Sequence, residues 1–281
     1  MNMEFNIRIE KAKKEIEDAE YILLGGGAGL SDAAGLEYSG ESFEQNFAPF
    51  IDKYGFTDLY SAGFYEYETQ EERWAYWAKH ISMMRYGIGT TRLYMDLFQL
   101  VKDKKHFVMS TNVESQFEIA GFSGDRVFEV QGDLCYIQCA KGCHDKVYYN
   151  ESLIKEMAEK IVDCRIPSKL IPKCPVCGGE MDVNLRCDEY FVQDKNWYKS
   201  NNSYNAFLKE SEGKKIVYIE LGVGFNTPGI IRYPFERMTY TNQNATLIRL
   251  NRVYPQSINE NKDKTIPFDE DMQKVISEII K

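Results

Sequence analysis

The sequence predicts an α/β protein with a Rossmann-like, doubly wound and mostly parallel sheet, interrupted by an inserted small zinc-ribbon domain. Short apolar runs alternate with helix-like segments, which is typical of a parallel sheet whose strands are joined by helices. Glycine-rich turns follow two of these runs, and all seven cysteines lie between residues 133 and 187. These observations predict a nucleotide-binding domain at residues 1–132 and 188–281 and a zinc-binding domain at residues 133–187.

Each element of that fold has a local signal. In residues 6–19, the spacing of Ile7, Ile9, Ala12 and Ile16 predicts one apolar face of a helix. Apolar and β-branched runs bounded by turn residues predict buried strands at 21–24, 106–111, 127–130, 216–224 (with its turn) and 246–251. Further helices are expected at 70–103, with a break near 87–89, and at 112–122, 202–213 and 268–281. Residues 32–65 lack clear periodicity, so we expect a long loop with short helical pieces there.

The composition excludes several classes of function. The chain has 281 residues, 43% of them hydrophobic, which is enough for a full core. Its net charge of -9 argues against a broad electrostatic surface for nucleic acid. No apolar run is long enough to span a membrane, and the charged start is unlike a secretory signal. We therefore expect a cytoplasmic protein whose cysteines are metal ligands or free thiols rather than disulfides.

Two glycine-rich turns predict a dinucleotide site. Gly27, Ala28 and Gly29 follow the first strand and open a helix, where glycine lets the backbone approach a pyrophosphate. The spacing is neither a strict G-x-G-x-x-G nor a Walker motif, so an ordinary tight turn is the alternative. A second turn, with Gly222, Gly224 and Asn226, follows another strand, and Asn251 ends a third. Because ligands bind at the carboxyl edge of such sheets, the three strand ends together favour a dinucleotide.

The cysteine spacing predicts a structural zinc site. Cys139 and Cys143 form one pair, and Cys174 and Cys177 form a second pair in the sequence KCPVCGG. Four thiolates in a tetrahedral array suit Zn²⁺ and leave no open position. Because the first pair has the looser spacing, Cys135 is a rival ligand and His144 a weaker one. Cys164 and Cys187 are expected to be buried thiols outside the site.

The segment VFEVQGD, residues 127–133, ends a predicted strand at Gln131. An amide donates and accepts hydrogen bonds but cannot take up a proton near neutral pH. We interpret Gln131 as a residue that orients a ligand. A trace of a lost activity and an ordinary turn residue are the alternatives.

An ordered set of motifs resembles the sirtuin family over nearly the whole chain. GAGLSDAAGL resembles the phosphate-loop motif G-A-G-x-S-x-x-S-G-I, and STNVE resembles T-Q-N-I-D. EVQGD resembles the strand ending in E-x-H-G, but Gln131 replaces the histidine. CAKGC and CPVC resemble the zinc module, GVGFNTP the G-T-S-x-x-V-x-P turn, and LIRLN the strand ending in Asn. Glu37 and Tyr38 stand where P-D-F-R is usual, Thr111 replaces Gln, and Glu114 replaces Asp.

This pattern of departures is similar to the macrodomain-linked, class M sirtuins. That resemblance implies an NAD-dependent protein mono-ADP-ribosyltransferase that releases nicotinamide and modifies a lipoylated carrier protein similar to glycine-cleavage protein H. It also implies a macrodomain hydrolase that reverses the modification as a further partner. The alternatives are an NAD-dependent deacylase that tolerates glutamine, and a catalytically silent sensor of NAD or ADP-ribose.

The resemblance also implies roles for individual residues. Asn112 and Gln131 are the implied catalytic residues, with Asn112 near the nicotinamide ribose and Glu114 near the nicotinamide amide. Glu37 and Tyr38 are candidates to approach the ribose, whereas His80 and His106 are expected to be structural. The implied phosphate contacts are Gly27, Ala28, Gly29 and Ser31, and the implied adenosine contacts are Gly222, Gly224, Asn226 and Asn251.

Overall fold

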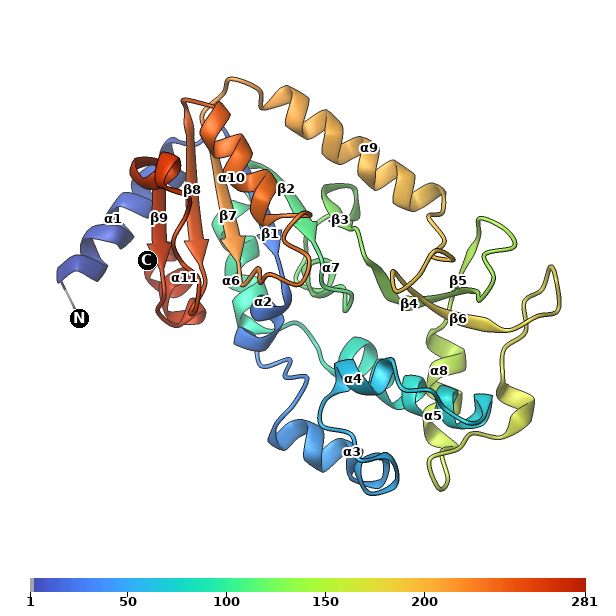
Figure 1. The fold of residues 1–281 in the computed structure, drawn as a ribbon. Coiled ribbons are helices and arrows are strands. Elements are labelled where there is room, and N and C mark those ends of the chain that lie inside the picture. Colours follow the sequence, from blue (N-terminus) through green and yellow to red (C-terminus); the bar gives the residue numbers. More distant parts are fainter. Residues whose placement is uncertain (1–2) are drawn as a thin grey trace. The chain divides into compact units, whose positions relative to one another are not determined.

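The computed structural model describes residues 3–281 and divides them into two compact units (Figure 1). The first, here called the sheet unit, comprises the described residues up to Gly35, Thr90–Gln131 and Asn196–Lys281. The second, the cysteine unit, comprises Leu36–Gly89 and Gly132–Lys195. Residues 36–89 thus group with the cysteine-bearing segment, so the second unit is larger than the zinc-binding insert expected at 133–187.

The sheet unit contains a parallel sheet of six strands in the order β3-β2-β1-β7-β8-β9. The sheet confirms the doubly wound fold predicted from the sequence. Gly26 pairs with Ser110 on one side and Leu221 on the other, and Leu221 pairs with Leu250. These neighbouring strands therefore end together, and the residues that follow them meet at one edge of the sheet. The strands are β1 (Tyr21–Gly26), β2 (Lys105–Ser110), β3 (Val127–Glu129), β7 (Ile216–Leu221), β8 (Ala245–Leu250) and β9 (Thr265–Phe268).

Helices cover this sheet and bury apolar side chains against it. In α1 (Met3–Asp18), Phe5, Ile9, Ala12 and Ile16 are buried, at the four-three-four spacing that places side chains on one face. Ile7 is 63% exposed, so its predicted place on that face is wrong, because it lies half a turn round the helix from Ile9. The other helices are α2 (Ala28–Ala33), α6 (Arg92–Val101), α7 (Gln116–Ile119), α9 (Lys195–Glu210), α10 (Arg232–Thr241) and α11 (Met272–Ile280).

The cysteine unit combines helices with a small antiparallel sheet of order β5-β4-β6. Residues 41–54 form a helix, where the sequence predicted mainly loop. Phe43, Phe47 and Phe50 are its buried face, and Pro49 and the many polar neighbours mask their periodicity in the sequence. The elements are α3 (Glu41–Tyr54), α4 (Leu59–Gly63), α5 (Gln70–Ile81) with its π-helical end (Ser82–Gly87), α8 (Glu151–Glu159), β4 (Gly132–Cys139), β5 (Val147–Tyr149) and β6 (Met181–Leu185).

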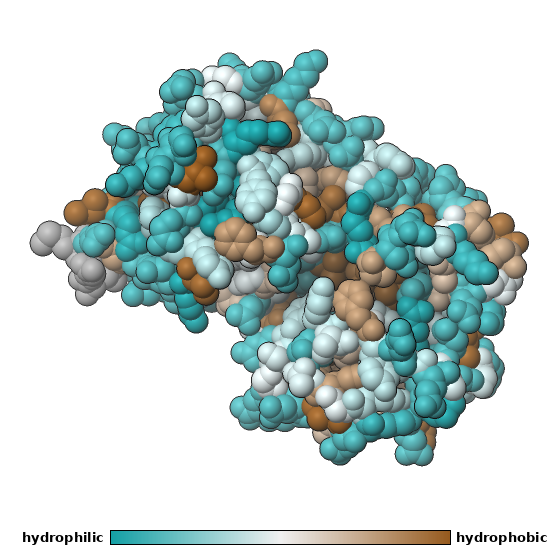
Figure 2. Space-filling view, in the orientation of Figure 1, coloured by the Kyte–Doolittle hydropathy of each residue, from teal (hydrophilic) through white to brown (hydrophobic). Residues whose placement is uncertain are grey.

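The surface agrees with the acidic, polar composition. On the face drawn in Figure 2, hydrophilic residues cover most of the area and hydrophobic residues occur in small groups. Among residues 3–281, no helix is both long enough and apolar enough to cross a membrane.

Candidate active site and metal centre

The two predicted glycine turns pack directly against each other at the edge of the sheet. The amide of Gly27 donates to Leu221 O at 3.0 Å, and that of Gly29 donates to Gly222 O at 3.0 Å. Gly222 has φ 62°, and a Cβ there would lie 2.4 Å from the carbonyl carbon of Gly29. Only glycine suits Gly222, because the position needs both a left-handed backbone and a close approach. Packing between the turns thus accounts for these glycines with or without a nucleotide.

A buried polar cluster lies behind the first turn, at the end of β2. The carboxyl group of Glu114 accepts a hydrogen bond from Ser31 Oγ and lies 3.4 Å from Tyr94 Oη. Asn112 Nδ2 donates to Gly27 O at 3.0 Å and to Tyr94 Oη at 3.3 Å. We call these four residues, Ser31, Tyr94, Asn112 and Glu114, the amide–carboxyl cluster. It joins segments far apart in the sequence beside the first glycine turn.

Glu114 lies in a buried environment that disfavours the ionised form of its carboxyl group. Its side chain is fully buried, and burial raises its pKa above the ordinary value, although hydrogen bonds from Ser31, Val113 and Tyr94 oppose the rise. Burial likewise raises the pKa of Tyr94 well above its usual range, so its hydroxyl stays protonated.

Asn112 keeps one polar atom unused. A carbonyl oxygen can only accept, so the amide nitrogen of Asn112 must be the atom that faces Gly27 O. Its amide oxygen has no hydrogen-bond partner within residues 3–281. Asn112 is also 8% exposed, unlike the fully enclosed Ser110 before it. The fixed nitrogen therefore orients an acceptor oxygen at the end of β2.

Gln131 is the last residue of the sheet unit and follows β3. It is half-buried, and its side chain forms no hydrogen bond inside the part of the chain that the structure describes. The next residue, Gly132, has φ 102°, and a Cβ there would lie 2.0 Å from Asn184 O. The glycine is thus required by the turn, whereas nothing in the turn requires glutamine.

A different kind of polar cluster lies beneath the second turn. Glu220 accepts from Arg249 Nη2 at 2.8 Å and from Arg232 Nη1 at 3.2 Å, and all three side chains are buried. Burial raises the pKa of Glu220, and the guanidinium groups of Arg249 and Arg232 oppose that rise. Arg249 also pairs with Glu236 at 2.8 Å. We call Glu220, Arg232, Glu236 and Arg249 the ion-pair cluster.

The remaining predicted adenosine contacts lie above the ion-pair cluster. Gly224 and Asn226 occupy the exposed turn between β7 and α10. Asn251 Nδ2 donates to Val223 O at 2.9 Å, and its Oδ1 accepts from the amides of Val253 and Tyr254 at 3.1 and 2.9 Å. The side chain of Asn251 therefore links the second glycine turn to the loop after β8.

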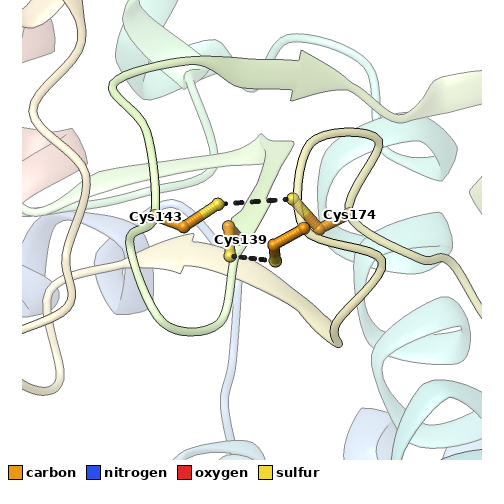
Figure 3. Close-up of side chains that lie close together, drawn as sticks. Cys139, Cys143 and Cys174 are labelled. Carbon is orange, nitrogen blue, oxygen red and sulfur yellow. Dashed lines mark hydrogen bonds between the residues drawn. The ribbon is translucent and has the colours of Figure 1, made fainter.

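The four predicted zinc ligands converge in the cysteine unit (Figure 3). The thiols of Cys139, Cys143, Cys174 and Cys177 lie within 4.8 Å of one another, and two of the S–S distances are 3.8 and 3.7 Å. A tetrahedral Zn²⁺ with Zn–S bonds of about 2.3 Å places its sulfur ligands about 3.8 Å apart, so the donor set fits structural zinc.

The other cysteines lie outside this cluster. Cys135 is buried in β4 and takes no part in it, which answers the question of the rival ligand. Cys164 is buried as predicted, but Cys187 is exposed, so its prediction as a buried thiol is wrong. Cys187 comes two residues after β6 ends, beyond the sheet that would cover it. His144 Nδ1 lies 3.1 Å from Cys143 Sγ and borders the site.

The histidines expected to be structural are engaged in packing. His80 is enclosed among aromatic rings, and burial lowers its pKa to about 3, so the ring is neutral. Its Nδ1 lies 2.9 Å from Tyr76 Oη, and the ring of Tyr38 packs edge-on against it. His106 Nδ1 lies 3.0 Å from Lys104 O at the start of β2. Neither of these two histidines belongs to the amide–carboxyl cluster.

The sequence did not single out Tyr94, although it contacts three of the predicted site residues. Its hydroxyl lies within 3.4 Å of polar atoms of Ser31, Asn112 and Glu114. In the sequence it is one of many tyrosines on an amphipathic helix, α6, and nothing local marks it. Only the packing of α6 beside the ends of β1 and β2 reveals its place.

The sheet order and the cysteine ribbon define the class of the protein as sirtuin-like. One solved structure, described as the structural basis of sirtuin substrate affinity, aligns with TM-score 0.62 and 15% identity over 99% of this chain and 98% of that one. A second, a Sir2 complex with a p53 peptide and NAD⁺, aligns with TM-score 0.60 and 16% identity over 96% and 95%. At this identity the likeness shows the fold.

Sequence comparison then gives the family. A protein ADP-ribosyltransferase of Staphylococcus aureus is 34% identical over 269 residues, covering 95% of this chain and 85% of that protein. A probable bifunctional ADP-ribose hydrolase/ADP-ribosyltransferase of Fusarium oxysporum f. sp. cubense is 33% identical over 80% of this chain and 39% of its own length. No family model matches the chain. The chain belongs to the protein ADP-ribosyltransferases of the sirtuin fold.

Proposed function

We propose that this enzyme transfers ADP-ribose from NAD⁺ to a lipoylated carrier protein similar to glycine-cleavage protein H, and releases nicotinamide. The observation that carries the proposal is that Gln131, two residues after β3, occupies the position where the sirtuin motif has histidine and leaves its amide without a hydrogen bond to the rest of residues 3–281. The family names of both relatives support the transfer reaction, whereas the carrier rests on the resemblance of the motifs.

The bond changes explain why an amide suffices. The bond between nicotinamide nitrogen and C1′ of the ribose breaks, and its electron pair leaves with nicotinamide. A lone pair of the acceptor then forms the new bond at C1′. A carboxylate acceptor brings no proton to remove, so this step needs no general base. Deacylation does need one, because a ribose hydroxyl must lose its proton before it attacks, and a glutamine amide cannot accept it at neutral pH.

The geometry supports distinct roles for the predicted site residues. Asn112 presents a fixed acceptor oxygen, suited to a ribose hydroxyl near the reacting carbon. Gln131 presents both a donor and an acceptor, suited to orienting the acceptor group or a hydroxyl. Glu114 is more enclosed than either, and its carboxyl is held by Ser31 and Tyr94. Its proposed role is to shape the nicotinamide end of the site.

Two further proposals concern the setting of the reaction. The Fusarium relative is named for a hydrolase as well as a transferase, which supports a hydrolase partner that removes the modification. Four of the cysteines cluster as metal ligands do, a use of thiols that is typical of reducing compartments, which supports a cytoplasmic location. Lys104 and Lys105 are poor candidates for docking the carrier, because Lys104 Nζ donates to Glu17 O and Lys105 Nζ to Tyr21 Oη.

Intact-mass analysis tests the proposal. The protein is incubated with NAD⁺ and the carrier, prepared with and without its lipoyl group, and also with an acetylated peptide. We expect the ADP-ribosyl adduct on the lipoylated carrier and no deacetylated peptide. Exclusive deacetylation would instead identify a deacylase, and binding of ADP-ribose without nicotinamide release would identify a sensor. In Gln131→His, deacetylation should appear, since the imidazole restores a base; its absence in a folded variant would contradict the role given to Gln131.

A further inference from the structure

We propose that Phe225 and Tyr254 form a platform on which the purine ring of the donor nucleotide stacks, and that Arg232 positions this platform. The inference rests on the proposed use of NAD⁺ as donor. It deepens that function by assigning base recognition to ring stacking rather than to hydrogen bonds from Asn251.

The platform consists of two half-exposed rings at the carboxyl edge of the sheet. Phe225 follows β7 and Tyr254 follows β8, and each side chain is 49% exposed. Their ring centroids are 4.9 Å apart with an interplanar angle of 85°. Tyr60 and Phe64 form another exposed ring pair, so exposure alone identifies no site. The place of Phe225 and Tyr254, after the second glycine turn and after β8 beside the proposed ligand site, points to a planar ligand.

Arg232 is buried and contacts the Phe225 ring and the backbone of Tyr254. Its guanidinium lies 4.7 Å from the Phe225 ring centroid, and its Nη2 donates to Tyr254 O at 3.1 Å and to Gln256 O at 3.3 Å. The side chain is only 4% exposed and is paired with Glu220. Because the arginine is planar and bound at several points, it fixes the two loops in one relative position. Arg232 does not itself face solvent, so it acts as a positioning residue.

The platform recognises shape rather than the edge of the base. In an edge-to-face pair, one ring edge meets one face of the other ring, and Arg232 covers one face of Phe225, so ring faces remain for a third ring. The Asn251 side chain, the candidate from the sequence for contact with the adenosine half, is already bound to Val223, Val253 and Tyr254. Stacking tolerates different bases, since every base has a π-face. The donor site should therefore accept hypoxanthine in place of adenine.

Calorimetry with ADP-ribose and steady-state kinetics test the platform together. The double variant Phe225→Ala/Tyr254→Ala should weaken ADP-ribose binding about tenfold. It should raise KM for NAD⁺ by a similar factor with kcat unchanged. With nicotinamide mononucleotide, which lacks the adenosine half, its kcat/KM should equal that of the wild type. The matched control is Tyr60→Ala/Phe64→Ala, which removes another exposed pair with centroids 4.9 Å apart, on α4 and just after it, and should change neither quantity.

Three further measurements complete the test. Tyr254→Phe keeps the ring and should bind ADP-ribose as the wild type does. Arg232→Lys should raise KM for NAD⁺ but not for nicotinamide mononucleotide, whereas a purely structural loss would affect both donors equally. Nicotinamide hypoxanthine dinucleotide should have a KM within about threefold of that for NAD⁺ in the wild type.

The outcomes separate this inference from the proposed function. Unchanged ADP-ribose affinity in the double variant overturns the platform. An equal loss with both donors overturns it as well. If the wild type binds ADP-ribose and the double variant does not, but no carrier is modified, the platform stands and the proposed transfer fails.

Discussion

Two buried polar clusters lie at the same edge of one sheet and differ in how they balance charge. In the amide–carboxyl cluster, Glu114 has hydroxyl and backbone donors and forms no ion pair with the rest of residues 3–281. In the ion-pair cluster, Glu220 has guanidinium partners at 2.8 and 3.2 Å. The first cluster leaves an acceptor oxygen of Asn112 unused, whereas the second uses its arginines to bind the carbonyls of the loop after β8. The amide–carboxyl cluster thus leaves a polar atom available to a ligand, whereas the ion-pair cluster holds the loop after β8 in place.

The largest expected effect is on stability, in the ion-pair cluster. Glu220→Gln should lower the free energy of unfolding by about 3–5 kcal/mol, because it leaves two buried guanidinium groups without their shared counter-charge. Urea unfolding measures the change. Glu270→Gln is the matched control, since it removes the partner of Arg8 at a site where both side chains are more than a fifth exposed, and it should cost about 1 kcal/mol. Equal losses of unfolding free energy in the two variants would show that Glu220 does not balance the charge of Arg232 and Arg249.

The next largest effect is on activity, in the amide–carboxyl cluster. Asn112→Ala should lower kcat for ADP-ribosyl transfer roughly 10²–10³-fold, the usual result of removing one preorganised polar group at a reacting centre. Circular dichroism and urea unfolding should show a retained fold. Asn242→Ala is the control: its side chain also forms two hydrogen bonds, to Lys214 O and from Asn244 N, but lies in the loop that precedes β8. A similar loss of kcat in Asn242→Ala would show that the effect of Asn112→Ala does not come from a role at the reacting carbon.

The smallest effect is a pH dependence of stability that comes from Glu114. Burial raises the pKa of Glu114 above its ordinary value of 4.5, so the folded state binds the proton more tightly than the unfolded state. Its stabilising contribution is therefore complete below the unfolded pKa and is lost as pH rises through the folded pKa. Relative to Glu114→Gln, the wild type should lose stability over that window and then level off. Urea unfolding midpoints measured at a series of pH values test this prediction. Parallel curves of midpoint against pH for the wild type and Glu114→Gln would contradict it.

The sequence could predict the location of those candidate site residues that directly follow a strand. Gly27, Asn112, Gln131, Gly222 and Asn251 each follow an apolar run, and parallel strands bring such ends to one edge. The four zinc ligands were equally accessible, because spacing alone brings paired cysteines together. In contrast, Tyr94 and Arg232 lie on helices, and their sequences give no sign of what they contact.

The use of individual side chains was harder to foresee than their location. Ser31 is predicted to hold phosphate, and its hydroxyl also bonds to Glu114. Asn251 is predicted to hold the adenosine half, and its amide also links the second glycine turn to the loop after β8. Hydrogen-bond partners such as these come from segments distant in the chain, so no local pattern encodes them. The helix at 41–54 was missed for a related reason. Its three buried phenylalanines pack against aromatic rings that include Tyr76, which lies on a different helix.

The sequence by itself determined the parallel sheet, the order of the site motifs and the two cysteine pairs of the zinc site. Each depends on properties that neighbouring residues share: alternation of apolar runs, glycine freedom and cysteine spacing. The tertiary structure decided which carboxyl is buried among hydroxyl and backbone donors and which is paired with arginine, and which amide atoms stay unused. Those outcomes depend on distances between segments up to a hundred residues apart, and a buried charge or hydrogen bond is fixed only once those segments have met.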